Sequence, residues 1–210
     1  MTTVVIPFAG ADGKSRLHES RQVRRTVSLA MLGDVLAACV PIGDACVVTS
    51  DAEGADVARD AGATIVADPG RGQGAAVVHA LDGVEPGATL IVNSDVPCAV
   101  PDDLRSLLAA TPAGGMALVE AMDGTTNALS ISAAETFAPL YGRDSASRFR
   151  AHARELGIDA VSVVIPNLSD DVDTLDDLSR LHLRLGPRSQ AALAQVAEGF
   201  AADASSHEVS

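Results

Sequence analysis

Aspartates at the ends of two apolar runs are the side chains in this sequence best suited to binding a cation. Asp95 closes the run 89–95 and is followed by Pro97, which has no backbone donor and stops a strand there. A carboxylate at the carboxyl end of a buried strand loses hydration, so its charge needs a partner or a cation. The alternative is an aspartate that caps the next helix, although Val100–Pro101 and Asp102 suit that role better.

The second acidic site is the stretch SDDVDTLDDL, which follows the last apolar run. In an extended chain residues i and i+2 point the same way, so Asp171 and Asp173 can face one cation. Mg²⁺ prefers hard oxygen ligands, usually one or two carboxylates together with substrate phosphates. The alternative is an acidic helix N-terminus, with Asp173 or Thr174 as the cap and Asp176 and Asp177 in the first turn. The two interpretations are compatible.

A basic, glycine-containing loop follows the first apolar run. Gly10 and Gly13 let backbone N–H groups approach an anion, and Lys14 and Arg16 supply the positive charge that a triphosphate needs. The segment is neither a P-loop nor a dinucleotide fingerprint, because GxxxxGK[ST] and GxGxxG are both absent from it. A solvated basic loop is the alternative.

Polar residues in two further segments can bind a small anionic ligand. Thr126 and Asn127 offer neutral hydrogen-bond donors, and Gly142 and Ser145 lie at a predicted helix start. A helix N-terminus with serine at its cap binds phosphate or carboxylate by geometry. The alternative is that Ser145 only caps its helix.

Short β-branched runs alternate with helical patterns along the chain, which predicts an α/β fold. The strands read as apolar on both faces, which is typical of a mostly parallel sheet inside a three-layer α/β/α sandwich. In such sheets ligands bind beyond the carboxyl ends of the strands. We expect one domain over residues 1–200 and a polar, disordered tail over 201–210. The expected strands are 3–8, 45–50, 63–68, 88–95 and 160–165, with an antiparallel hairpin over 116–132, and the expected helices are 20–39, 52–62, 74–81, 145–156, 175–185 and 188–200.

Composition limits the partners and the compartment. The formal net charge of −13 argues against nucleic acid, whose binding depends on clustered Lys and Arg. Three cysteines are too few and too irregularly spaced for a disulfide framework, so they indicate reduced thiols. No apolar run approaches the roughly 18 residues of a membrane span, and no signal peptide is evident. We expect a soluble, cytoplasmic protein that binds no membrane. Whether it forms a homodimer is left open by the sequence.

Six motifs in a fixed order resemble the 2-phospho-L-lactate guanylyltransferase family of coenzyme F(420) biosynthesis. Its actinobacterial members are similar enzymes that use phosphoenolpyruvate. The resemblance covers nearly the whole chain up to about Leu185. The motifs are IPFAGADGKSRL, AMLGDVLAA, NSDVPCAV, DGTTNAL, YGRDSASRFRAHARELG and DVDTLDDL.

This resemblance implies a GT-A-like nucleotidyltransferase fold, as in the nucleotide-diphospho-sugar transferases. It also implies transfer of GMP from GTP to phosphoenolpyruvate or 2-phospho-L-lactate, with Mg²⁺ as cofactor. Lys14, Arg16 and Asp95 would be catalytic residues. The two basic side chains, Lys14 and Arg16, would act by holding phosphates. The metal ligands would be Asp95, Asp171 and Asp173, the acceptor would contact Thr126, Asn127, Gly142 and Ser145, and the nucleotide would contact Phe8, Ala9, Gly10, Lys14, Gly72 and Gln73.

The sequence departs from the family pattern at several of these positions. Ser94-Asp95-Val96-Pro97 stands where the family commonly has Gly-Asp-Leu-Pro, and Gln73-Gly74 stands where relatives usually have Leu-Asn. A related nucleotidyltransferase with another base or acceptor, such as a sugar phosphate or a pterin cofactor, is therefore an alternative. A nucleotide-binding module without turnover is another, but all three metal-ligand candidates are present.

Overall fold

The computed structural model describes the backbone of residues 2–10 and 20–207 and their side chains up to residue 199. Within these residues seven strands form one sheet in the order β3-β2-β1-β4-β6-β5-β7. Strand β6 is antiparallel to β4 and β5, and the other neighbours are parallel, as the expected hairpin requires. The strands are β1 Thr3–Pro7, β2 Asp44–Thr49, β3 Thr64–Ala67, β4 Thr89–Val92, β5 Met116–Glu120, β6 Thr126–Ile131 and β7 Ala160–Ser162.

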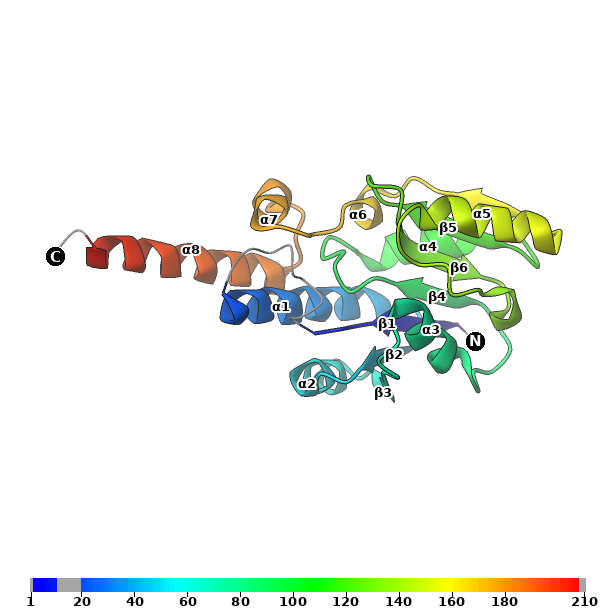
Figure 1. Ribbon diagram of the computed structural model, residues 1–210, viewed down its shortest axis with the longest axis horizontal. Coiled ribbons are helices and arrows are strands. Elements are labelled where there is room, and N and C mark those ends of the chain that lie inside the picture. Colours follow the sequence, from blue (N-terminus) through cyan, green and yellow to red (C-terminus); the bar gives the residue numbers. More distant parts are fainter. Residues whose placement is uncertain (1, 11–19, 208–210) are drawn as a thin grey trace.

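Helices cover both faces of this sheet (Figure 1). Alternate strand residues face opposite sides, so Val4 and Ile6 pack with one helix layer while Val5 packs with the other. Helices α1, α2, α4 and α6 form the first layer, and α3 and α5 form the second. This is the predicted three-layer α/β/α sandwich. The helices are α1 Arg21–Cys39, α2 Ala52–Asp60, α3 Gln73–Leu81, α4 Pro101–Ala110, α5 Ser145–Leu156, α6 Pro166–Ser169, α7 Leu175–Leu181 and α8 Pro187–His207.

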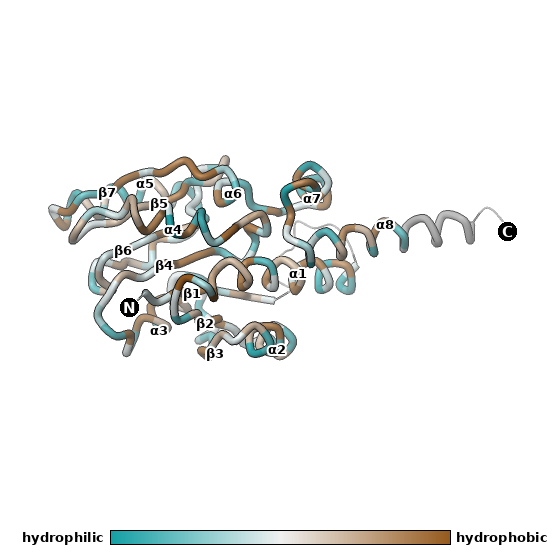
Figure 2. Tube along the Cα trace, turned by 180° about the vertical axis from the view of Figure 1, so that it is seen from behind, coloured by the Kyte–Doolittle hydropathy of each residue, from teal (hydrophilic) through white to brown (hydrophobic). Residues whose placement is uncertain are grey.

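The five inner strands are buried on both faces, as a helix-covered sheet requires, whereas the edge strands β3 and β7 are partly exposed. The four residues of β4 are at most 1% exposed, and Figure 2 shows an apolar path along this strand. Within the described residues, no helix combines the length and apolar character needed to cross a membrane. The three cysteines are buried and free.

Several expected element ends differ from those in the structure. Strand β4 ends at Val92 and not at Asp95, because Ser94 and Asp95 already form a turn. The last strand stops at Ser162, since Pro166 starts the short helix α6. Helix α7 is also shorter than expected and ends at Leu181, where a turn follows.

Helix α8 lies beside α1 and then extends away from the body of the molecule (Figure 1). It was expected to end at residue 200, but it continues to His207. Its start is fixed by Asp34 of α1, whose carboxylate accepts hydrogen bonds from the backbone N–H groups of Arg188 (3.1 Å) and Ser189 (2.7 Å). A third cluster of buried apolar residues joins α1, α7 and α8.

Candidate active site

Three carboxylates from two distant parts of the sequence converge at the carboxyl edge of the sheet. Asp95, Asp171 and Asp173 each offer an oxygen, and these oxygens lie within 4.8 Å of one another. The backbone N–H of Val172 donates to the carbonyl of Asp95 (2.9 Å), which fixes one segment against the other. Val172 is fully buried, so its two neighbours project to the opposite side. The structure thus brings together the three aspartates that the sequence singled out.

The electrostatics of this cluster suit a bound cation. Burial, and then the neighbouring charge of Asp95 and to a lesser degree that of Asp173, raise the pKa of Asp171, although a hydrogen bond from Asn127 opposes this. Like charges this close repel each other, and a divalent cation would relieve that repulsion. The donor set consists of carboxylate oxygens, which Mg²⁺ and Mn²⁺ prefer. These residues therefore fit a hard divalent cation.

The alternative interpretation of the acidic stretch holds for its second half. Thr174 is the N-cap of α7 and forms a capping box with Asp177. The Oδ2 atom of Asp177 accepts from the backbone N–H groups of Asp173 (3.2 Å) and Thr174 (2.9 Å). Asp177 thus belongs to the helix start, and it holds the backbone of Asp173 while the Asp173 carboxylate faces the cluster.

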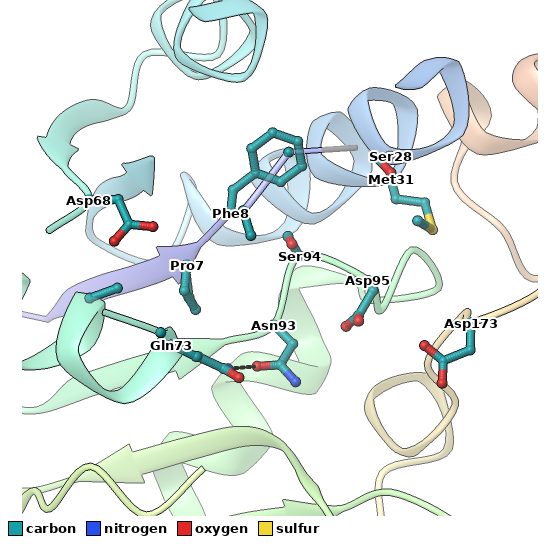
Figure 3. Close-up of a pocket in the computed structure, with 14 residues that line it drawn as sticks. Pro7, Phe8, Ser28, Met31, Asp68, Gln73, Asn93, Ser94, Asp95 and Asp173 are labelled. Atoms are coloured by element: carbon teal, nitrogen blue, oxygen red, sulfur yellow. Dashed lines mark hydrogen bonds between the residues drawn. The ribbon is translucent and has the colours of Figure 1, made fainter. Parts of the chain in front are cut away.

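A first cavity of about 250 Å³ opens on one side of the carboxylates (Figure 3). It is lined by five of the residues expected to contact a nucleotide: Phe8, Ala9, Gly10, Gly72 and Gln73. Gly10 has φ of +73°, and a Cβ there would lie 2.7 Å from the carboxylate of Asp51, so glycine is required at this wall. Lys14 and Arg16 lie outside the described residues.

A second cavity of about 450 Å³ opens on the other side of the carboxylates. All four residues expected to contact the acceptor line it: Thr126, Asn127, Gly142 and Ser145. One detail of the prediction is wrong, because the N-cap of α5 is Asp144, in the left-handed conformation, and not Ser145. Ser145 is instead fully buried, and its hydroxyl donates to Thr126 Oγ1 (3.1 Å).

The second cavity is also lined by a positively charged side chain that sequence reasoning missed, that of Arg143. Its charged lining residues are Asp95, Asp123, Asp144, Asp171, Asp173 and Arg143. Within the part of the chain that the structure describes, Arg143 forms no hydrogen bond or ion pair. The loop that carries it is anchored by Tyr141, which packs edge-on against Phe149 with ring centroids 5.4 Å apart. The only sequence signal was an arginine directly after Gly142.

Asn93 is a second residue that sequence reasoning missed. It follows β4, two residues before Asp95, and the apolar run suggested only a buried strand residue. In the structure its side chain accepts a hydrogen bond from the Gln73 amide (2.7 Å; Figure 3). Asn93 lines both cavities, as do Gln73, Asp95 and Asp173. The two cavities therefore meet at these side chains.

Solved structures of nucleotide-dependent transferases share this α/β fold. A nucleotidyl transferase from Methanothermobacter thermautotroptrophicus superposes with a TM-score of 0.64 at 14% identity, covering 88% of this chain and 96% of that one. Glucosyl-3-phosphoglycerate synthase from Mycobacterium tuberculosis, solved with Mg²⁺ and uridine-diphosphate, gives a TM-score of 0.55 at 16% identity, covering 77% and 68%.

Sequence comparison defines the family within this class. Residues 2–192 match the family described as "Guanylyl transferase CofC like". Phosphoenolpyruvate guanylyltransferase of Streptomyces coelicolor is 39% identical over 210 residues, covering 92% of this chain and 96% of that protein. The protein of the same name from Roseiflexus castenholzii is 38% identical and covers 82% of each chain. The chain therefore belongs to the CofC-like guanylyltransferase family.

Proposed function

We propose that this protein transfers GMP from GTP to a small phosphorylated acid, phosphoenolpyruvate or 2-phospho-L-lactate, and releases pyrophosphate, as a step in coenzyme F(420) biosynthesis. Family membership and the names of the relatives support the guanylyl donor and favour phosphoenolpyruvate as acceptor. The observation that carries the proposal is the position of the Asp95, Asp171 and Asp173 carboxylates between two cavities.

The three aspartates would hold a divalent cation such as Mg²⁺, which when bound supplies positive charge that offsets the charge of the phosphates. The first cavity would take the nucleotide, with Phe8, Ala9 and Gly10 on one side. Gly72 and Gln73 would contact it from the start of α3. Lys14 and Arg16 follow Gly10 in the sequence and would contact the phosphates.

The second cavity would take the acceptor acid. A phosphorylated acid carries two anionic groups, and Arg143 offers a guanidinium suited to bidentate recognition of one of them. The Thr126 hydroxyl would donate to the acceptor phosphate near the carboxylate cluster, while Asn127, Gly142 and Ser145 form the wall around the acceptor. We propose that Arg143 binds the carboxylate, because the phosphate must point toward the nucleotide.

In the proposed reaction, an acceptor phosphate oxygen attacks the α-phosphorus of GTP. The new P–O bond forms as the bond from the α-phosphorus to the bridging oxygen breaks, and pyrophosphate leaves. Such catalysis consists mostly of positioning and charge neutralisation, which requires no protein nucleophile. Among the described residues, those that line the two cavities would position the substrates, and the aspartates where the cavities meet would hold the cation that neutralises charge.

The expected partners and cellular compartment follow from the net charge and from the thiols. A net charge of −13 disfavours nucleic acid as a partner, and three buried free thiols favour a reducing compartment such as the cytoplasm.

A substrate panel tests the activity directly. The protein is incubated with Mg²⁺, each of the four nucleoside triphosphates and one acid, and pyrophosphate release is followed. The acids are phosphoenolpyruvate, 2-phospho-L-lactate and 3-phosphoglycerate. We expect release with GTP and one of the first two acids. Release only with another base or with 3-phosphoglycerate would support the alternative transferase, and no release with any pair would support a non-catalytic binding protein.

A matched pair of substitutions links the activity to the aspartate cluster. Asp95→Asn keeps the size of the side chain and removes its charge, so turnover should fall by orders of magnitude in a folded protein. Asp176→Asn makes the same change at an exposed first-turn residue of α7 that lines neither cavity, and it should retain wild-type turnover. Equal activity of the two variants would contradict the assigned role of Asp95.

A further inference from the structure

Three side-chain amides form a continuous hydrogen-bonded row that ends on one of the candidate metal ligands. Gln73 Nε2 donates to Asn93 Oδ1 (2.7 Å), and Asn93 Nδ2 donates to Asn127 Oδ1 (3.4 Å). Asn127 Nδ2 in turn donates to Asp171 Oδ1 (3.4 Å). Each amide therefore donates toward the carboxylate cluster, and the row begins at Gln73, which lines both cavities.

The backbone fixes the members of this row in place. Gln73 is the first residue of α3, after Gly72, whose φ of +87° turns the chain into the helix. The backbone N–H of Asn93 donates to the carbonyl of Asn127 (2.9 Å), so these two side chains start from neighbouring points of the sheet. Asn127 is 1% exposed, and its amide has little room to reorient without its partners.

The direction of the row matters because an amide has two different ends. Asn93 Nδ2 also donates to the carbonyl of Thr126 (3.2 Å), which sets which end of Asn93 faces Asn127. Asn127 then accepts with its oxygen and presents its NH₂ to Asp171 and to the carbonyl of Ser169 (3.3 Å). The opposite orientation would place the Asn127 oxygen against a carboxylate, which is repulsive.

We propose that Asn93 is a positioning residue for the cation site, acting through Asn127 to orient the carboxylate of Asp171. The inference rests on the proposed cation role of the three aspartates. With one Asp171 oxygen held by Asn127, its carboxylate has a fixed rotation, and the cluster keeps a geometry that suits one ion. Partners that orient a ligand in this way commonly contribute about 10- to 100-fold to metal affinity.

The test is Mn²⁺ binding without substrates, measured from the electron paramagnetic resonance signal of the free ion. We expect Asn93→Ala to raise the dissociation constant about 10- to 100-fold. Asn167→Ala deletes an amide that is also partly buried, and that donates to Asp103 (3.1 Å) away from both cavities, so it should bind Mn²⁺ like the wild type. Circular dichroism would verify that each variant is folded. Asn93→Ala with wild-type affinity would overturn the proposal.

A double substitution tests whether the amides act as one row. Gln73→Leu keeps the size of the side chain and removes the donor to Asn93, so affinity should fall in the same direction but by less. The double variant Gln73→Leu/Asn93→Ala should bind no more weakly than Asn93→Ala alone, whereas independent effects would multiply and overturn the row. If Asn93→Ala does not fold, Gln73→Leu decides, and unchanged affinity overturns the proposal.

Pyrophosphate release by the wild type, measured separately, distinguishes this inference from the proposed function. Mn²⁺ binding that depends on Asn93, in a protein without transferase activity, would leave the positioning role standing while the proposed reaction fails. Transferase activity in a protein whose Mn²⁺ binding is insensitive to Asn93 would support the proposed reaction and overturn the positioning role of Asn93.

Discussion

Asp34 should be one of the residues on which the stability of the α1–α8 arrangement depends most. Its side chain comes from the middle of α1, and the residue is 4% exposed. The two carboxylate oxygens accept from the first backbone N–H groups of α8, at 3.1 Å from Arg188 and 2.7 Å from Ser189. Asp34→Ala would remove both acceptors and leave at least the buried N–H of Ser189 without a partner.

The size of the effect follows from these two bonds. A hydrogen bond to a charged group contributes about 1.5–3 kcal/mol, so losing two predicts roughly 3–5 kcal/mol of unfolding free energy after partial compensation by water. For a chain of this length, 1 kcal/mol corresponds to about 2–4 °C in Tm, which predicts a fall of roughly 6–20 °C. Asp34→Asn keeps one acceptor oxygen and should lose about half as much.

Thermal unfolding followed by circular dichroism, together with urea unfolding, would measure the effect. Asp60→Ala is the matched control, because Asp60 is exposed at the end of α2 and should change stability by less than about 0.5 kcal/mol. If Asp34→Ala and Asp60→Ala unfolded at the same temperature, the carboxylate would not stabilise α8 and the reasoning would be refuted.

Three further outcomes are expected. Burial raises the pKa of the Cys46 thiol to about 11 and also raises the pKa values of the Cys39 and Cys98 thiols. At pH 8 a disulfide reagent should therefore label these three cysteines only in unfolded protein. Rapid labelling of the folded protein would contradict this expectation. Gly74→Ala would place a Cβ 2.7 Å from that of Pro139, on the loop that leads to the acceptor cavity, and should raise the KM for the acceptor more than that for GTP; an unchanged KM ratio in steady-state assays would refute it. Asp177→Asn should cost about 1 kcal/mol in urea unfolding and weaken Mn²⁺ binding, because Asp177 holds the backbone of Asp173; a loss of stability without weaker binding would separate the two roles.

Much of the fold could be predicted from the sequence because the strands carry a strong local signal. Runs such as Leu90–Val92 are apolar at every position, which is typical of a sheet covered on both faces. The bounds of α5, at Ser145 and Leu156, were predicted correctly. The ends of β4 and β7 were not. The expected β4 included the polar residues 93–95, which lie beyond its pairing, and apolar residues continue over 163–165 after β7 has ended.

The candidate site was predictable where chemistry and position coincide. Asp95, Asp171 and Asp173 combine a charge with a strand end or an i, i+2 spacing, so their meeting could be anticipated. Arg143 and Asn93 could not be found in this way. An arginine in a loop and an amide after a strand are common, and their meaning depends on which distant residues the fold places beside them.

The central claim is that nucleotide and acceptor meet at the three carboxylates. A crystal structure with Mn²⁺, a non-hydrolysable GTP analogue and phosphoenolpyruvate, with the ion located by anomalous diffraction, tests it most directly. We predict Mn²⁺ coordinated by Asp95, Asp171 and Asp173, with the triphosphate on the Phe8–Gly10 side and the acid beside Arg143. An ion bound elsewhere, or both ligands in one cavity, would contradict the account.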